Sequence, residues 1–301
     1  MWQPEPGWHA LPGGSGPSTV GVWRTAVDGR AVVVKRFAAP GPSDPPELSD
    51  PRHFAWWRRG ADVLESGVVR ATEGLCADYR AWVEEDEDGI TLTQDWVEDA
   101  ASNGLFLAHA LGRFAHADLG ERPWLATDQL RDRLARTAHR GGWPTLARTT
   151  VADIAEHLWA ARSRMLDSLD ALPQVAQHGD PTPSNLPGRV GDEVVAVDWG
   201  TLGRGPVGGD LGFYLLAARE EFEPLLEAYL LGLGDLATAE QAAHGARVTA
   251  VYTAMSRAEW ALARVAGGEG ALAAKYRHPA VEPHLLTLQR QFPLIERLME
   301  Y

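Results

Sequence analysis

Apolar and polar residues alternate over much of the first hundred residues, which is the period of a strand with one buried face. The clearest pair of such segments flanks Asp28-Gly29, a dipeptide typical of tight hairpin turns. An acidic turn at residues 86–89 separates a second pair in the same way. The expected strands cover residues 8–11, 20–26, 31–37, 81–85 and 90–97. A Pro-rich loop over residues 38–52 and one helix over residues 53–66 complete this part of the chain.

From about residue 100 onward the apolar residues recur three and four positions apart, which is the period of a helix. The longest such stripe runs from residue 151 to 172 and ends at Pro173, which cannot continue a helix. Further helices are expected over residues 105–114, 211–218, 223–233, 239–266 and 283–299. The pattern therefore predicts an α+β fold with a small antiparallel-sheet lobe (residues 1–98) and a larger, mostly helical lobe (residues 99–301).

The segment that follows the long helix carries the most specific signal in the sequence. It contains His178-Gly179-Asp180, then Asn185, then a β-branched run that ends at Asp198. Phosphoryl transfer from a nucleotide needs one carboxylate to orient the attacking hydroxyl and accept its proton. It also needs an amide oxygen and a second carboxylate to hold Mg²⁺ against the phosphates. We therefore expect Asp180 to act on the hydroxyl and Asn185 and Asp198 to bind the metal.

A second signal lies near the N-terminus, where a short Gly-rich turn at residues 13–16 joins two expected strands. Glycines let a backbone approach phosphate oxygens and leave its N–H groups free to point at them. Lys35 lies on the returning strand, and it is one of only two lysines among 28 basic residues. A compact ammonium in a chain that otherwise uses arginine suits a phosphate contact.

These motifs resemble the aminoglycoside phosphotransferase family of bacterial small-molecule kinases. The segments HGDPTPSN, VDWG and GDLG and the hinge-like Trp96–Asp99 run in family order across nearly the whole chain. The resemblance implies a bilobal, protein-kinase-like fold with Asp180 as the catalytic residue, Asn185 and Asp198 as Mg²⁺ ligands, and Asp210 as a brace for the catalytic loop. The residues it implies for nucleotide binding are Lys35, Gly13, Gly14, Ser15, Gly16, Val33, Glu98 and Ala100.

Two features depart from the protein-kinase pattern. Gly60 stands where a glutamate often pairs with the strand lysine, which leaves Asp62, Glu65 or no acid as the partner of Lys35. Thr182 stands where protein kinases carry a lysine, and the sequence has no A-P-E segment. The second departure argues against a protein substrate.

Composition narrows the remaining choices. A net charge of −13 disfavours nucleic-acid binding and slightly favours a cationic acceptor. Glu220, Glu221 and Glu223 could meet such an acceptor or could instead interact with a helix dipole. No apolar run reaches the length of a membrane span, which predicts a cytoplasmic protein without a membrane partner. Cys76 is the only cysteine, so we expect it to be a buried apolar residue.

The sequence therefore predicts a Mg²⁺-dependent kinase that transfers the γ-phosphate of ATP or GTP to a hydroxyl of a small molecule. Aminoglycosides, other antibiotics, amino sugars and small alcohols are all compatible acceptors. The alternative is a nucleotide-binding regulator without catalysis, which the glycine at position 60 suggests. The presence of Asp180, Asn185 and Asp198 argues against that alternative.

Overall fold

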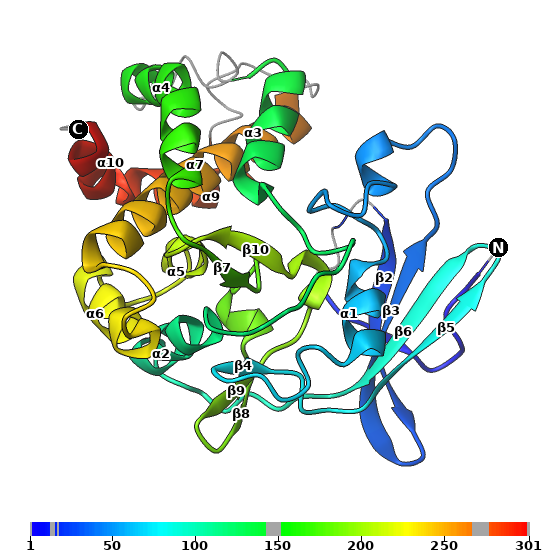
Figure 1. Cartoon of the computed structure of the whole chain (residues 1–301). Helices are drawn as coiled ribbons and strands as arrows, with labels where there is room; N and C mark the ends of the chain where they lie inside the picture. Colours follow the sequence, from blue (N-terminus) through cyan, green and yellow to red (C-terminus); the bar gives the residue numbers. More distant parts are fainter. Residues whose placement is uncertain (1, 13–15, 17, 143–151, 267–276, 300–301) are drawn as a thin grey trace.

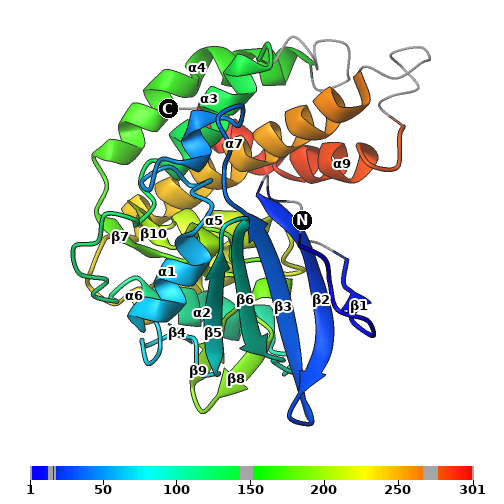
Figure 2. The same ribbon diagram turned by 90° about the vertical axis from the view of Figure 1, so that its right-hand side faces the viewer.

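A computed structural model describes residues 2–12, 16, 18–142, 152–266 and 277–299. The first lobe is built on a five-stranded antiparallel sheet in the order β1-β2-β3-β6-β5. Its strands are β1 (His9–Ala10), β2 (Thr19–Val27), β3 (Arg30–Ala38), β5 (Ala81–Asp86) and β6 (Gly89–Asp95). Figures 1 and 2 show this sheet beside the larger helical lobe, with helix α1 (Arg59–Ser66) against it. The expected α+β fold with a small sheet lobe and a larger helical lobe is confirmed.

The two faces of strand β3 have different roles. Val32, Val34 and Arg36 are buried on one face, where the Arg36 guanidinium lies 5.4 Å from the ring of Trp2. Lys35 and Phe37 lie on the opposite face because successive side chains of a strand alternate. Phe37 packs there against the apolar residues of α1 and β6. Lys35 therefore lies on the face of the sheet that carries α1.

Helix α1 begins at Arg59 and not at residue 53, so the expected helix is correct only in its second half. The cause is the Arg59 side chain, which is fully buried and donates hydrogen bonds to the carbonyl groups of Pro51, His53 and Phe54. Carbonyls that turn toward one guanidinium cannot also point along a helix axis. Residues 53–58 form turns as a result.

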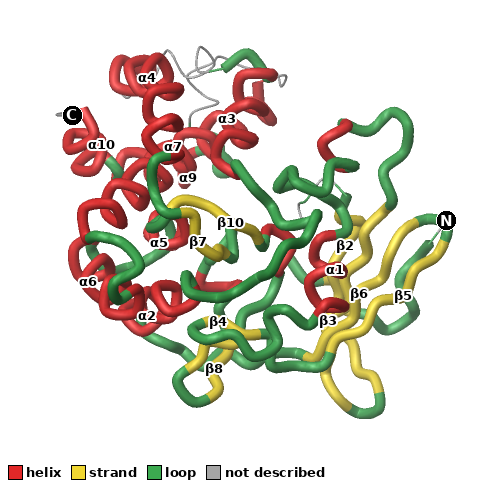
Figure 3. Tube along the Cα trace, in the orientation of Figure 1, coloured by secondary structure: helices red, strands yellow, loops and turns green. Residues whose placement is uncertain are grey.

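The larger lobe contains most of the helices, which Figure 3 separates by colour from the strands. They are α2 (Gly104–Phe114), α3 (Gln129–His139), α4 (Ala152–Asp170), α5 (Gly209–Leu215), α6 (Phe222–Leu233), α7 (Ala239–Ala266), α9 (Glu282–Arg290) and α10 (Phe292–Met299). Helices α2 and α6 pack at very close range, because a Cβ on Gly112 would lie 2.1 Å from the carbonyl oxygen of Tyr229. None of the helices in the described ranges is long and apolar enough to cross a bilayer.

Small β-elements connect these helices. Strands β7 (Gln174–Gln177) and β10 (Gly203–Pro206) form an antiparallel pair. A second sheet has the order β4-β9-β8, in which β4 (Leu75–Cys76) pairs parallel with β9 (Glu193–Val195), and β8 (Gly188–Val190) completes it. Residues 75–76 therefore pair with a strand of the larger lobe. Cys76 is buried in this sheet, as expected.

Two further parts of the helical lobe differ from the sequence-based expectation. The single helix expected over residues 283–299 is two helices, α9 and α10, which meet at Gln291. Pro293 lies in the first turn of α10, where its missing N–H costs nothing, whereas it would break a continuous helix. Helix α3 was not expected from the apolar pattern. The expected start of helix α4 at residue 151 lies outside the described residues, and α4 is described from Ala152.

Candidate active site

Asp180 and Asn185 face each other across the loop that follows strand β7. The Asn185 amide nitrogen donates to the Asp180 main-chain carbonyl at 2.9 Å and to the Asp180 carboxylate at 3.3 Å. Asn185 ends a 3₁₀ helix (Pro183–Asn185), which curls the loop so that both side chains meet. The N–H of Val197 donates to the main-chain carbonyl of Asn185 at 2.9 Å, which places the next residue, Asp198, beside this loop. The three side chains predicted to act together are thus brought to one place.

Lys35 reaches this place from the sheet. Its ammonium lies 2.9 Å from a carboxylate oxygen of Asp198, with 13% of the lysine side chain and 48% of the aspartate side chain exposed. The Lys35 charge lowers the pKa of Asp198 and outweighs burial, which acts in the opposite direction. Asp198 has a left-handed backbone conformation (φ 64°) immediately before a 3₁₀ helix (Trp199–Thr201), and that turn presents its carboxylate to the sheet. This ion pair joins β3 to the larger lobe.

Asp210 holds the loop that carries Asp180. Its two carboxylate oxygens accept hydrogen bonds from the N–H groups of His178 and Gly179 at 2.7 and 2.9 Å. Burial raises the pKa of Asp210 to about 7, against the effect of these two hydrogen bonds. The expected bracing role of Asp210 therefore agrees with its contacts.

His178 connects the loop to the segment that carries Asp198. Burial lowers the pKa of His178 to about 4, so its ring is neutral at physiological pH. A neutral ring can donate from Nε2 to the carbonyl of Val197 at 3.0 Å and accept at Nδ1 from the N–H of Asp180 at 3.3 Å. The ring also packs on Trp199 at 4.8 Å. His178 thus serves to position the loop.

Neither of the acids considered as a partner for Lys35 takes that role. Asp62 and Glu65 both bind the guanidinium of Arg58, at 3.1 and 3.2 Å. A Cβ built on Gly60 would lie 3.9 Å from the backbone of Gly200, an ordinary contact distance, so α1 faces the Asp198-Trp199-Gly200 turn at this position. The neighbouring Arg59 donates to the Gly200 carbonyl at 3.2 Å. Arg59, and not an acid on α1, links this helix to the turn that carries Asp198.

The structure describes only some of the residues that were expected to bind the nucleotide. Gly13, Gly14 and Ser15 lie outside the described residues. Gly16 is described, and its carbonyl accepts from the N–H of Thr19 at 3.0 Å at the start of β2. Val33 is partly buried on the Lys35 face of β3.

Glu98 and Ala100 are exposed after strand β6. The N–H of Ala100 already donates to the carbonyl of Pro187 at 2.7 Å. The Ala100 carbonyl is therefore the group that this residue can offer to a base.

The model of the phosphotransferase enzyme family matches residues 9–247, from strand β1 into helix α7. This chain belongs to that family. The match confirms the resemblance drawn from the motifs. A search of the curated proteins returns no match.

Solved structures with the same fold include choline kinase LicA from Streptococcus pneumoniae, with a TM-score of 0.56 and 12% identity over 96% of this chain and 93% of that chain. An aminoglycoside phosphotransferase from Alicyclobacillus acidocaldarius has a TM-score of 0.52 and 15% identity over 97% and 91% of the two chains. Spectinomycin phosphotransferase, solved with ADP and spectinomycin, has a TM-score of 0.54 and 10% identity over 94% and 93%. At these identities the likeness establishes the fold alone.

The side chains of this phosphotransferase offer oxygen ligands that suit Mg²⁺. The Asn185 amide nitrogen faces Asp180, so its oxygen faces away from that residue, and the Asp198 carboxylate is ionised. Within the described residues no group of three or more His, Cys, Asp or Glu side chains could hold a metal ion. Mg²⁺ is commonly held by one or two protein groups together with phosphates and water, so this donor set fits it.

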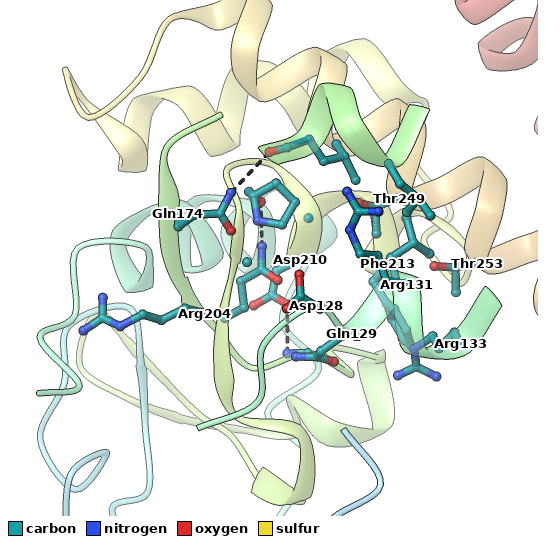
Figure 4. A pocket seen from close by; sticks show the side chains of 18 of the residues that line it. Asp128, Gln129, Arg131, Arg133, Gln174, Arg204, Asp210, Phe213, Thr249 and Thr253 are labelled. Atoms are coloured by element: carbon teal, nitrogen blue, oxygen red, sulfur yellow. Dashed lines mark hydrogen bonds between the residues drawn. The ribbon is translucent and has the colours of Figure 1, made fainter. Parts of the chain in front are cut away.

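A cavity lies behind the catalytic loop, on the Asp210 side. It has roughly 630 Å³ of empty space, part of it open to solvent, and Gly179, Asp210, Phe213 and Arg133 line it. Figure 4 shows Arg133 at one edge of this cavity and Arg204 at the other. Neither Asp180 nor Lys35 is among the described residues that line it.

The structure also shows neighbours of Asp180 that the sequence analysis missed. Arg257 on α7 lies 3.5 Å from a carboxylate oxygen of Asp180. Arg133 on α3 also acts on Asp180 electrostatically. Neither arginine stands out in a chain that uses arginine for nearly every basic position. Burial raises the pKa of Asp180, whereas the charges of Arg133 and Arg257 act to lower it.

One of the acidic residues before α6, Glu220, contacts the N-terminus of α2. Glu220 accepts a hydrogen bond from the N–H of Gly104, the first residue of α2, at 2.9 Å. A carboxylate at a helix N-terminus is favourable because the unpaired N–H groups there carry a partial positive charge. Of the two interpretations of this acidic group, the contact of Glu220 fits the helix-dipole one.

Proposed function

We propose that this chain is a Mg²⁺-dependent phosphotransferase that moves the γ-phosphate of ATP or GTP to a hydroxyl group of a small molecule. The observation that carries the proposal is the meeting of Asp180, Asn185, Asp198 and Lys35 at one point between the sheet and the larger lobe. Phosphoryl transfer depends on positioning and charge neutralisation, and these four groups are the ones it requires. The family to which the chain belongs supports the same reaction class.

Asp180 is the catalytic residue in this proposal. Its carboxylate accepts the proton of the acceptor hydroxyl while the hydroxyl oxygen forms a bond to the γ-phosphorus. The bond between that phosphorus and the bridging oxygen of the β-phosphate breaks, and a nucleoside diphosphate leaves. The hydrogen bond from Asn185 and the Arg257 charge fix the orientation of the Asp180 carboxylate before the acceptor arrives.

The donor side uses groups from both lobes. Asn185 and Asp198 would hold Mg²⁺, which when bound offsets the charge of the phosphates. Lys35 binds the phosphates from β3, together with main-chain N–H groups of the segment Gly13, Gly14, Ser15 and Gly16. Val33 faces the base, while Glu98 and Ala100 meet its polar edge with main-chain groups.

The deciding experiment measures ADP and GDP release by the purified chain, with Mg²⁺ and a panel of hydroxyl compounds. Asp180→Asn keeps the size of the side chain but removes the base, so we expect it to abolish acceptor-dependent release. Asp192→Asn is the matched control, since Asp192 is an exposed acid on the β8–β9 turn. Equal activity of wild type and Asp180→Asn would contradict the assigned role.

One observation favours a second function, a nucleotide-binding regulator without turnover. Lys35 pairs directly with Asp198, and α1 provides no acid to draw it away. A regulator would bind the Mg²⁺–nucleotide complex without releasing a diphosphate in the presence or absence of an acceptor. Calorimetric binding of nucleotide, measured on the same protein as ADP release, separates the two functions.

The proposal extends to three further expectations. The lobes divide between residues 98 and 99, the protein acts in the cytoplasm where the nucleotide is made, and its partner is a small molecule and not a nucleic acid. The net charge of −13 supports the last of these.

A further inference from the structure

Two arginines approach Asp180 from the helical side of the site. Arg257 projects from α7 and lies 3.5 Å from the Asp180 carboxylate. Arg133 projects from α3, and its strongest favourable charge interaction is with Asp180. Both guanidinium groups lie over the ring of Phe213, at 4.3 Å for Arg257 and 5.3 Å for Arg133. One ring therefore holds two like charges beside a single carboxylate.

The Asp180 carboxylate cannot neutralise both arginines. Within the part of the chain that the structure describes, the Arg133 guanidinium donates no hydrogen bond to a protein group and forms no ion pair. It lies over the rings of Phe54 and Phe213, and burial lowers its pKa to about 10. Burial also lowers the pKa of Arg257, for which Asp180 is the opposing charge. A half-buried guanidinium without a hydrogen-bonded partner is costly, so the site has capacity for one more negative group.

Nearby acids on the same helices are committed elsewhere. Asp132, next to Arg133, accepts from the N–H of Phe54 and lies 3.6 Å from His53. Glu259, two residues after Arg257, is bound by Arg140. The charge of Asp132 favours the charged form of Arg133, but among the described residues neither Asp132 nor Glu259 is hydrogen-bonded to Arg133 or Arg257.

The other titratable neighbours do not supply the missing anion either. Burial and the Arg257 charge lower the pKa of His284, which leaves it neutral near pH 7. Arg136, which also lies over Phe54, pairs with Glu47 at 3.7 Å. An anionic group on a ligand would give the Arg133 guanidinium the hydrogen-bonded partner that the described residues do not provide.

We propose that the acceptor of this phosphotransferase carries a negatively charged group, a carboxylate or a phosphate, in addition to its hydroxyl. Arg133 and Arg257 bind that group while Asp180 faces the hydroxyl. Guanidinium groups suit this task because their planar fork matches the oxygens of carboxylate and phosphate. The inference rests on the proposed function, and it reverses the acceptor class that the net charge alone suggests.

The positions of the charged groups separate this anion from the nucleotide. Lys35 reaches Asp198 from β3 of the sheet, whereas Arg133 and Arg257 reach Asp180 from α3 and α7 of the larger lobe (Figure 1). The phosphates of the donor already have Lys35 and the metal ligands. The two arginines therefore flank the catalytic carboxylate on the side left for the acceptor.

The first test compares acceptors that differ at one carbon, which is a carboxylate in one member and a hydroxymethyl group in the other. Glycerate and glycerol, and gluconate and glucitol, are such pairs, and choline and kanamycin are cationic probes. Binding to the full chain is measured by calorimetry with a non-hydrolysable ATP analogue and Mg²⁺, and turnover by ADP release with ATP. We expect the anionic member of a pair to bind about 10- to 100-fold more tightly, because each charge-assisted hydrogen bond contributes that much.

A panel in which no anionic member binds better than its neutral match overturns the inference. Diphosphate release with a neutral or cationic acceptor would then still support the kinase function. An absence of both nucleotide binding and diphosphate release would instead remove the proposed function itself. The two failures are therefore distinguishable.

The second test uses the arginines. Arg133→Met keeps most of the packing on Phe213 but removes the charge. We expect it to raise the KM for the anionic acceptor by about 10- to 100-fold and to leave the KM for ATP unchanged. Arg133→Lys restores the charge without the planar fork, so we expect an intermediate KM. Arg80→Met, at an exposed arginine that pairs with Asp95, is the control.

A rise in the KM for ATP without a change in the KM for the acceptor would overturn the inference, because the arginines would then serve the transferred phosphate. A thermal melt accompanies each variant. If Arg133→Met does not fold, the comparison of Arg133→Lys with wild type decides by the same criterion.

Discussion

The two sides of Asp180 are built in different ways. On the donor side, Asn185, Asp198 and the His178 ring belong to one segment of the chain, and only Lys35 comes from far away. On the opposite side, Arg133 and Arg257 come from two helices, and Arg257 is 77 positions from Asp180. The donor side therefore has a fixed spacing that can be recognised in a sequence. The proposed acceptor side depends instead on how helices pack, so no fixed spacing marks it in the sequence.

The strongest way to break this comparison is to disable the donor side. Asp198→Ala removes the partner of Lys35, which is also a proposed metal ligand. We expect kcat to fall by about 100- to 1,000-fold, since groups that stabilise transition-state charge contribute that much. The measurement is ADP release at saturating ATP. If Asp198→Ala instead raises the KM for the acceptor and leaves kcat unchanged, the two sides of Asp180 do not have separate roles.

The next largest effect concerns the link between the lobes. Arg59→Met would leave buried carbonyls of Trp124, Phe54 and Pro51 without their donor. We expect the free energy of unfolding to fall by about 3 kcal/mol, because unpaired buried polar groups keep their full desolvation cost. Urea denaturation measures it. Arg80→Met, at an exposed ion pair, should change stability by less than about 1 kcal/mol.

Asp210, which holds the Asp180 loop, allows a prediction of how stability changes with pH. The pKa of Asp210 is raised to about 7 in the folded chain, so its contribution to stability is present at acidic pH and is lost as pH rises through about 7. Asp210→Asn should therefore destabilise the protein more at pH 5 than at pH 8. Urea denaturation of both proteins at the two pH values provides the comparison. A larger effect at pH 8 would mean that its two N–H hydrogen bonds outweigh burial.

The smallest expected effect is a shift in the pH profile. Burial raises the pKa of Asp180, so the acidic limb of kcat/KM should lie above the range of an ordinary aspartate. Arg257 acts to lower that pKa, and Arg257→Met should therefore move the limb to higher pH. Stopped or coupled assays between pH 4 and 8 give the profile. If the acidic limb of kcat/KM is unchanged in Arg257→Met, the Arg257 charge does not act on Asp180. That result would contradict the placement of Arg257 on the acceptor side.

The sequence predicted the sheet well because its signals are local. Asp28-Gly29 fixed one hairpin, and the alternation around Lys35 fixed which residues share a face. The start of α1 was wrong because Arg59 turns the preceding carbonyls toward its own side chain, and no local pattern announces that contact. The break at Gln291 was missed although Pro293 was visible, because the apolar stripe continues across it.

By itself, the sequence determined the fold class and the grouping of Asp180, Asn185 and Asp198, because spacing within one segment limits where its side chains can go. Only the tertiary structure decided that Lys35 pairs with Asp198, that Arg59 replaces an acid on α1 as the link to the larger lobe, and that two arginines stand beside Asp180. These contacts join residues far apart in the chain. Their formation depends on the packing of whole helices against the sheet and against each other, which no single stretch of sequence encodes.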